Sequence, residues 1–393
     1  MSVEIGTATD HANLLDLLDT FLTSQGMTLD PSFAGTGNGT IAGLIGGSAS
    51  VAEMVTITFT DATHFDVVGS ITGAIGSGTT GTPFSTTHIK FTITAGGTAF
   101  ISGDAFTVAT TPKWTSKRRT AGVEMIWQAP GNGNLDAILV GAKVFSDVAG
   151  DYYNWRLGGF TAFDAGLDFT HQPGYVGGAG QATGSPVLNL WNSTIDYWFV
   201  ASGRRVIVVA KVSTVYVVAY LGFASLYMSP GVFPYPLVVG GSASFGNEPS
   251  VGSASWRWSY AGVEISNFPI SHLGQVSNDS ACTLRLRLPS GLWRGFLADE
   301  NEPVVGRVWP YATISGGNGM LDWRPNLDGG YTILPVVLHD NTPNCYGELE
   351  GIGATTGFGQ SSENTITVGP DQWLVLQNIF RTTRTDYFAV KLS

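Results

Sequence analysis

The chain has 393 residues, of which 43% are hydrophobic and 12% charged, and its formal net charge is −11 at pH 7. Charged residues usually make up about a quarter of a protein. Their scarcity here, with 52 glycines, predicts many short strands joined by tight turns and a surface partly covered by neighbouring subunits. The diffuse negative charge argues against a nucleic-acid partner, which needs clustered Lys and Arg.

The cysteines, the N-terminus and the longest uncharged stretch indicate where the chain is made. Cys282 and Cys345 lie far apart and have no metal-ligand spacing, so we expect reduced thiols, with one structural disulfide as the alternative. Residues 1–4 lack the basic start of a signal peptide, so we expect assembly in the cytoplasm. Prolines and glycines interrupt the uncharged residues 212–247, which predicts buried strands and no membrane insertion.

The first predicted element is an amphipathic helix within residues 1–27. Thr9 or Asp10 can cap its start and Gly26 can end it. Its apolar stripe must pack either on the chain's own sheets or on another subunit, and in the second case residues 1–27 form an attachment segment. The candidate docking residues recur at helical spacing and are Leu14, Leu15, Leu18, Phe21 and Leu22.

Residues 28–112 are predicted to form a small β module. The composition changes there to Gly, Thr, Ala and Ser, and residues 55–60 (VTITFT) alternate with the period of a strand. Residues 61–63 mark a turn, and a strand resumes at Phe65. The Thr-rich faces of this module contain no group that looks chemically activated.

Residues 113–393 are predicted to form one large β-sandwich-type domain. Its centre is the stretch 196–223, which is dominated by β-branched and aromatic residues and is broken at Ser202 and Gly203. Further strand-like segments separated by glycine turns continue to the end of the chain, without a comparable helical period. We therefore expect a mainly all-β protein.

A row of aromatic residues in this domain is a candidate contact site. Trp256, Trp258 and Tyr260 alternate with small or polar residues, which places three rings on one face of a predicted strand. Such a row can stack on a sugar ring, but it more often forms a core face. Both interpretations stay open at this point.

No pattern of catalytic or metal-binding residues emerges, and we expect no catalytic residue, metal or cofactor. The six histidines are scattered singly, and no Cys-x-x-Cys or His-Glu-x-x-His motif is present. Asp299, Glu300 and Glu302 could supply the paired carboxylates of a glycosidase, but adjacent acids on an exposed turn stay ionised. The basic run 117–119 is either a phosphate-binding patch or a solvated linker edge.

Several local motifs, taken in their order along the chain, resemble tailed-bacteriophage virion proteins. The small module resembles a β module that recurs in them, on residues 35–40 (GTGNGT), 59–65 (FTDATHF) and 91–106 (FTITAGGTAFISGDAF). The large segment is similar to phage structural proteins at residues 151–155, 211–216, 220–223, 235–242, 346–349 and 386–390. The resemblance implies membership of a virion and transfers no site residues.

We therefore expect a structural protein of a phage tail or baseplate, present as a symmetric oligomer with other virion proteins and copies of itself, with the N-terminal helix and the small β module as its attachment parts. One alternative is a receptor- or glycan-binding tail or collar fibre, or a capsid decoration protein, that contacts a host-surface glycan through the Trp256 face. A second alternative is a polysaccharide-degrading enzyme.

Overall fold

The fold is mainly β. The computed structural model describes residues 1–24, 29, 31–110, 112–131, 138–177, 184–229, 231–244, 257–259, 267–268, 284–295, 306–309, 329–340, 345–379 and 383–392. Within these residues the strands pair antiparallel, and they are accompanied by one α-helix and one short 3-10 helix. The predicted all-β, sandwich-like fold class is confirmed.

The predicted central stretch forms the middle of a seven-stranded sheet. It folds into β15 (Ile195–Ala201), β16 (Arg205–Val212) and β17 (Val215–Phe223), with the first turn at Ser202 and Gly203 as expected. Nearly every side chain of these strands is buried. The other strands of this central sheet are β1 (Ser2–Ala8), β19 (Leu237–Gly240), β21 (Leu284–Arg287) and β22 (Trp293–Gly295).

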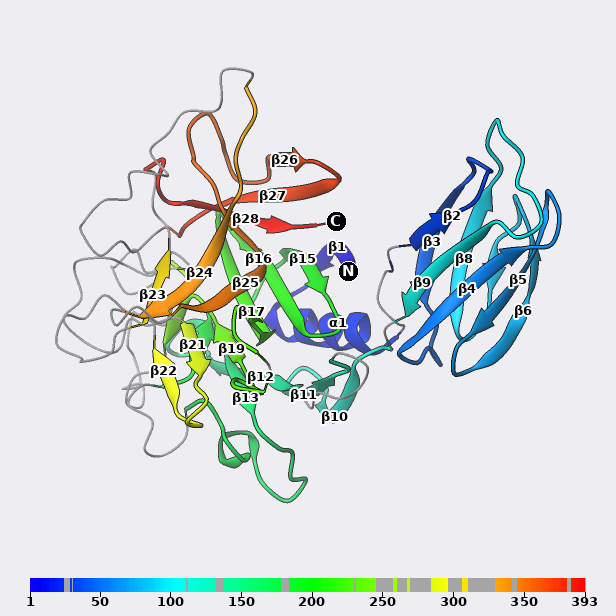
Figure 1. Ribbon diagram of the computed structural model, residues 1–393. Coiled ribbons are helices and arrows are strands. Elements are labelled where there is room, and N and C mark those ends of the chain that lie inside the picture. Colours follow the sequence, from blue (N-terminus) through cyan, green and yellow to red (C-terminus); the bar gives the residue numbers. More distant parts are fainter. Residues whose placement is uncertain are drawn as a thin grey trace.

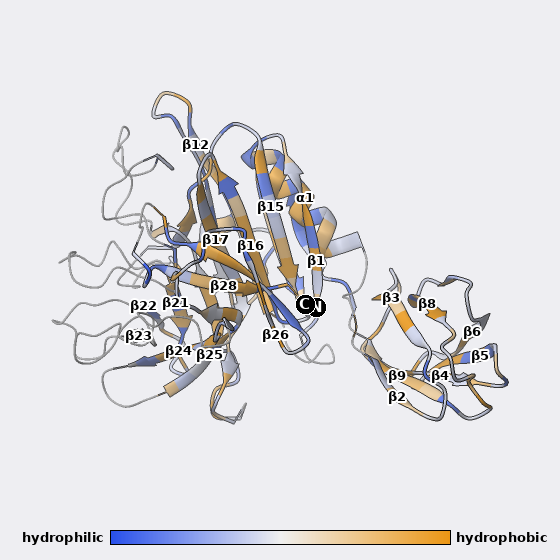
Figure 2. Ribbon diagram, turned by 90° about the horizontal axis from the view of Figure 1, so that it is seen from above, coloured by the Kyte–Doolittle hydropathy of each residue, from blue (hydrophilic) through white to orange (hydrophobic). Residues whose placement is uncertain are grey.

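The central sheet is buried on both faces, because alternate side chains of a strand point to opposite faces. Phe199, Val208 and Val217 belong to one hydrophobic core, whereas the neighbouring residues Trp198 and Val209 belong to another. Two further sheets cover these two faces. The body of the protein is therefore a three-layer stack of sheets, as Figures 1 and 2 show.

The first covering sheet packs on the same core as α1. Its strands are β10 (Thr115–Thr120), β11 (Glu124–Ala129), β12 (Ile138–Asp147), β13 (Tyr152–Phe160), β14 (Pro186–Leu188) and β20 (Ala243–Ser244). The second covering sheet is formed by β18 (Ser225–Leu226), β23 (Gly306–Trp309), β24 (Leu334–Asp340), β25 (Cys345–Ala354), β26 (Thr365–Val368), β27 (Asp371–Gln377) and β28 (Tyr387–Lys391).

The predicted helix is present as α1 (His11–Ser24), and Asp10 caps it by accepting hydrogen bonds from the backbone N–H groups of Ala12 and Asn13 at 2.8 Å. Buried polar contacts lock it onto the first covering sheet. Asp19 accepts hydrogen bonds from the indole N–H of Trp127 at 2.7 Å and from Arg119 Nε at 2.9 Å. The helix is therefore part of the body.

The predicted division into an attachment segment, a module and a large domain needs correction at its first boundary. β1 precedes the helix and pairs with β15 over its full length, so residues 1–24 belong to the body. The alternation of Val3, Ile5 and Thr7 was the sequence signal for this strand. The body therefore consists of the described residues of 1–24 and 112–392.

The module, residues 31–110, is inserted between α1 and β10 and has a hydrophobic core of its own. Its core is rich in phenylalanine, and the rings of Phe59 and Phe100 stack with centroids 3.8 Å apart. One sheet has the order β2-β9-β4-β5-β6 and the other β3-β8-β7. Their bounds are β2 (Pro31–Ala34), β3 (Thr40–Gly46), β4 (Glu53–Phe59), β5 (His64–Gly69), β6 (Gly73–Thr79), β7 (Phe84–Ser85), β8 (Ile89–Thr94) and β9 (Ala105–Thr110).

The two ends of this insertion meet at the end of α1. The backbone N–H of Trp114 donates to the carbonyl of Leu22 at 3.0 Å, so the body's own chain closes across the insertion point. In Figure 1 the module stands beside the body, joined through this region. Among the described residues, no helix is long and apolar enough to cross a membrane.

We expect the body to fold without the module, since the two have separate cores. Replacing residues 25–111 by a short Gly-Ser linker is expected to leave a cooperative thermal transition within about 5 °C of that of the full chain. Circular dichroism on melting measures it, with the isolated residues 28–112 as the matching second fragment. An aggregated or unfolded body would show that the module supports the body's core.

Candidate functional site

The basic run 117–119 lies on β10 and is engaged within the chain. Arg118 Nη1 lies 3.0 Å from Glu124 Oε1, and Lys143 Nζ lies 3.0 Å from the other oxygen of the same carboxylate. Arg119 pairs with Asp19 on α1. Arg118 and Arg119 are therefore committed to carboxylates of the chain, which disfavours the phosphate-patch interpretation.

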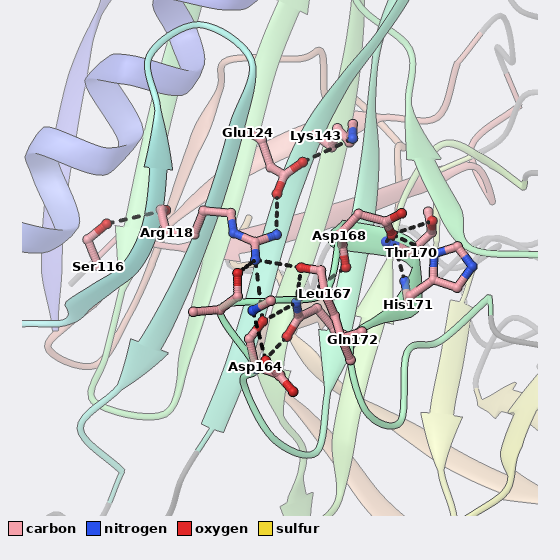
Figure 3. Close-up of polar contacts among 12 residues, drawn as sticks. Ser116, Arg118, Glu124, Lys143, Asp164, Leu167, Asp168, Thr170, His171 and Gln172 are labelled. Carbon is pink, nitrogen blue, oxygen red and sulfur yellow. Dashed lines mark hydrogen bonds and ion pairs between the residues drawn. The ribbon is translucent and has the colours of Figure 1, made fainter.

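Arg118 also anchors the loop that follows β13 (Figure 3). Its Nη2 donates to the backbone carbonyl of Leu167 at 2.6 Å and lies within 3.4 Å of those of Ala165 and Asp164. Its guanidinium stacks over the ring of Phe163 at 5.4 Å. The Arg118 side chain therefore holds residues 163–167, a stretch between β13 and the 3-10 helix Phe169–His171 that has no regular secondary structure.

The buried side chain of Gln172 also holds this loop through hydrogen bonds to its backbone. Gln172 is almost fully buried, and its side-chain amide donates to the carbonyls of Asp164 and Leu167 at 2.8 Å and 2.7 Å. Its oxygen accepts from the N–H of Asp164 at 2.9 Å. The loop is therefore held in one conformation by saturated hydrogen bonds and presents Leu167 to solvent.

Two turns share an Asp-x-Thr-His motif that sequence reasoning missed. In one, Asp168 caps the 3-10 helix Phe169–His171 and accepts from His171 Nδ1 at 2.7 Å, and this bond lowers the pKa of Asp168 to about 2. In the module, Asp61 bonds His64 in the same way. The repeated spacing was the signal that could have found them. Hydrogen bonds within each turn account for the geometry, so we assign neither a role in catalysis.

A second polar cluster joins the central sheet to the loop before β26. Lys211 Nζ and the phenolic oxygen of Tyr216 each lie 2.5 Å from Glu363 Oε1. The bond to Glu363 raises the pKa of Lys211 to about 12, and burial raises the pKa of Tyr216 to about 12. Both groups keep their protons at neutral pH, which favours a structural contact over proton transfer.

The predicted docking residues of the helix are not available to another subunit. Leu14, Leu15, Leu18 and Leu22 are fully buried in the chain's own core, and Phe21 is 8% exposed. The alternative in which the stripe packs on the chain's own sheets is therefore correct for this helix. The physical reason is that α1 covers apolar surface at the edge of the sandwich, between the central and the first covering sheet.

Of the predicted aromatic row, the structure describes Trp258. It is half-buried in a turn, and its ring meets that of Trp191 edge to face with centroids 5.3 Å apart. Trp256 and Tyr260 lie outside the described residues, as do Cys282 and the acids Asp299, Glu300 and Glu302. Cys345 is a free, exposed thiol. We call Trp191 and Trp258 the tryptophan pair; because both rings are only partly covered, the pair is a candidate for stacking on a ligand ring.

The outer face of the five-stranded module sheet is a candidate interaction surface. Alternate residues of β4, β5 and β9 point away from the phenylalanine core, and the register sets them side by side. Most of them are small or uncharged, with Met54 and Val68 each close to half-exposed. We call these residues the module face: Met54, Thr56, Thr58, His64, Asp66, Val68, Ala105, Thr107 and Ala109.

The described side chains include no group of three or more His, Cys, Asp or Glu placed to hold a metal ion. Comparisons with known proteins add little. No family model and no curated protein matches the chain. Among solved structures, two crystal structures of FlgL from Xanthomonas campestris are similar at 19% and 20% identity, each over 24% of this chain and with a TM-score of 0.19. The match spans 34% and 33% of those chains, and so low a TM-score carries no argument.

We expect Arg118→Lys to loosen the loop that follows β13. A lysine cannot reach Glu124 and the loop carbonyls together, and each charge-assisted hydrogen bond lost costs roughly 1.5–3 kcal/mol. Limited proteolysis should then cut within residues 161–177 faster than in the unchanged chain. Lys117→Arg is the matched control, and equal cleavage of Arg118→Lys and the unchanged chain would contradict the anchoring role.

Proposed function

We propose that this chain is a structural protein of a tailed-bacteriophage virion, part of the tail or baseplate, and that it acts by assembling with other virion proteins and with copies of itself. The observation that carries the proposal is the combination of a three-layer body with an inserted module whose outer face carries mostly uncharged side chains. A surface with few charges loses little hydration when another subunit covers it.

The resemblance of the motifs to phage virion proteins points in the same direction. In addition, Arg118 and Glu363 form hydrogen bonds with other groups of the chain. This suits a structural part that is assembled once better than it suits an enzyme that turns over substrates. Of the two attachment parts expected from the sequence, the proposal keeps the small β module and drops the helix, because the helix stripe is buried in the body.

The direct test is whether the chain is part of the particle. We expect mass spectrometry of purified virions to detect it, and an electron-microscopy map to show the body and the module in the tail or baseplate. Absence of the chain from purified particles would contradict the proposal.

A paired variant tests the module face within the same experiment. Met54→Lys with Val68→Lys places two charges on the face without touching the core, and we expect incorporation to fall by about tenfold or more. Val148→Lys is the matched control, since Val148 is 80% exposed on a turn of the body. Equal incorporation of both variants would remove the module face from the proposal.

The tryptophan pair favours one second candidate function, the binding of a host-surface glycan. Trp258→Ala is then expected to leave the melting temperature within about 3 °C while host adsorption or glycan binding is lost. Trp258→Phe, which keeps an aromatic ring, is the control and should retain part of the binding. A large fall in melting temperature for Trp258→Ala would show that the ring is needed by the core.

A further inference from the structure

The sheet edges of this protein are unequal in a way that points to a second interaction surface. An edge strand presents unpaired backbone N–H and C=O groups, and proteins usually guard such strands by shortness, proline, bulges or Lys and Arg side chains. Among the described strands, β7, β20, β22, β23 and β26 are edges of two to four residues. β2 is also short and begins with Pro31.

The longer edge strands, with one exception, have a register shift or basic side chains that hinder pairing with another strand. β3 and β6 each contain a register shift against the neighbouring strand. β10 contains a register shift and the basic side chains of residues 117–119. β1 has seven residues, pairs with β15 without any shift, and contains neither proline nor a basic residue.

β1 is also apolar at its centre. Ile5 is 61% exposed, although the residue opposite it on β15 is the buried Trp198. Among the described strands, β1 pairs with β15 along one of its edges, and the other edge of β1 is the end of the central sheet. Figure 2 shows β1 beside β15 at the border of the body. A regular edge without proline or a basic residue, and with an exposed isoleucine at its centre, is a template for another strand.

The sequence of β1 fits a second copy of itself. In an antiparallel pair related by a two-fold axis through Ile5, the five residues from Val3 to Thr7 find partners, and Ile5 lies opposite Ile5 of the other copy. Ser2 and Ala8, at the two ends of β1, are buried within the chain and lie outside this pairing. Glu4 then lies opposite Gly6, so no like charges meet. An axis through Glu4 would set two carboxylates directly opposite each other, which is unfavourable.

We propose that two copies of this chain pair antiparallel along β1, so that their central sheets join into one continuous sheet centred on Ile5. This inference deepens the proposed function, because it names a surface for self-association. It is tested on the purified chain alone, so that failure of the β1 contact and failure of the virion role are separate results.

The first measurement is the mass of the purified chain in solution by light scattering. We expect a concentration-dependent dimer, and we expect Ile5→Lys to weaken it by about tenfold or more, because two ammonium groups would face each other across the axis. Ile71→Lys is the matched control, since Ile71 is 72% exposed on a turn of the module. Circular dichroism checks that each variant is folded.

The second measurement does not depend on a destabilising change. In a Cys345→Ser background, Ile5→Cys should form a disulfide between two copies under mild oxidation, whereas Ile71→Cys should not. A monomer at high concentration, or a dimer that Ile5→Lys leaves intact and Ile5→Cys does not cross-link, would overturn the proposal. The latter result would mean that copies associate through another surface, such as the module face.

Discussion

The structure depends on one constraint: both faces of the strands β15, β16 and β17 are apolar, so neither face can be exposed to water. Val, Ile and aromatic side chains occupy both faces, so each face needs an apolar layer against it. The chain supplies these layers from opposite directions along the sequence. The first covering sheet comes mostly from residues before the meander, and the second comes from residues after it.

The helix and the first strand follow from the same constraint. β1 extends the central sheet by one strand, and α1 returns the chain across the opening between two sheets. A buried carboxylate would be costly alone, but Asp19 receives hydrogen bonds from Trp127 and Arg119, and it thereby ties the helix to β10 and β11. The insertion of the module at the end of α1 leaves this arrangement closed, because Trp114 bonds Leu22 across the gap.

Low charge has different consequences in the two parts of the protein. In the body, few ions are needed because the central sheet is enclosed, and the charged groups that remain hold loops, as Arg118 and Lys211 do. In the module, a two-layer fold leaves one face of the larger sheet open, and Thr and Ala are common on it, with Asp66 as a charged residue. The same low-charge composition therefore accompanies an enclosed sheet in the body and an open sheet face in the module.

Residue patterns alone determined the strands 196–223, the capped helix, the small β module and the all-β class, because these depend on local periodicity and turn chemistry. The tertiary structure decided which surface the helix stripe covers, since a stripe such as Leu14 to Leu22 packs equally well on its own sheets or on a neighbour. It also decided that residues 2–8 end the central sheet and that Arg118 is committed to a loop far along the chain. These features depend on contacts between segments that are distant in the sequence, such as β1 with β15 and Asp19 with Trp127. Local periodicity contains no information about such contacts.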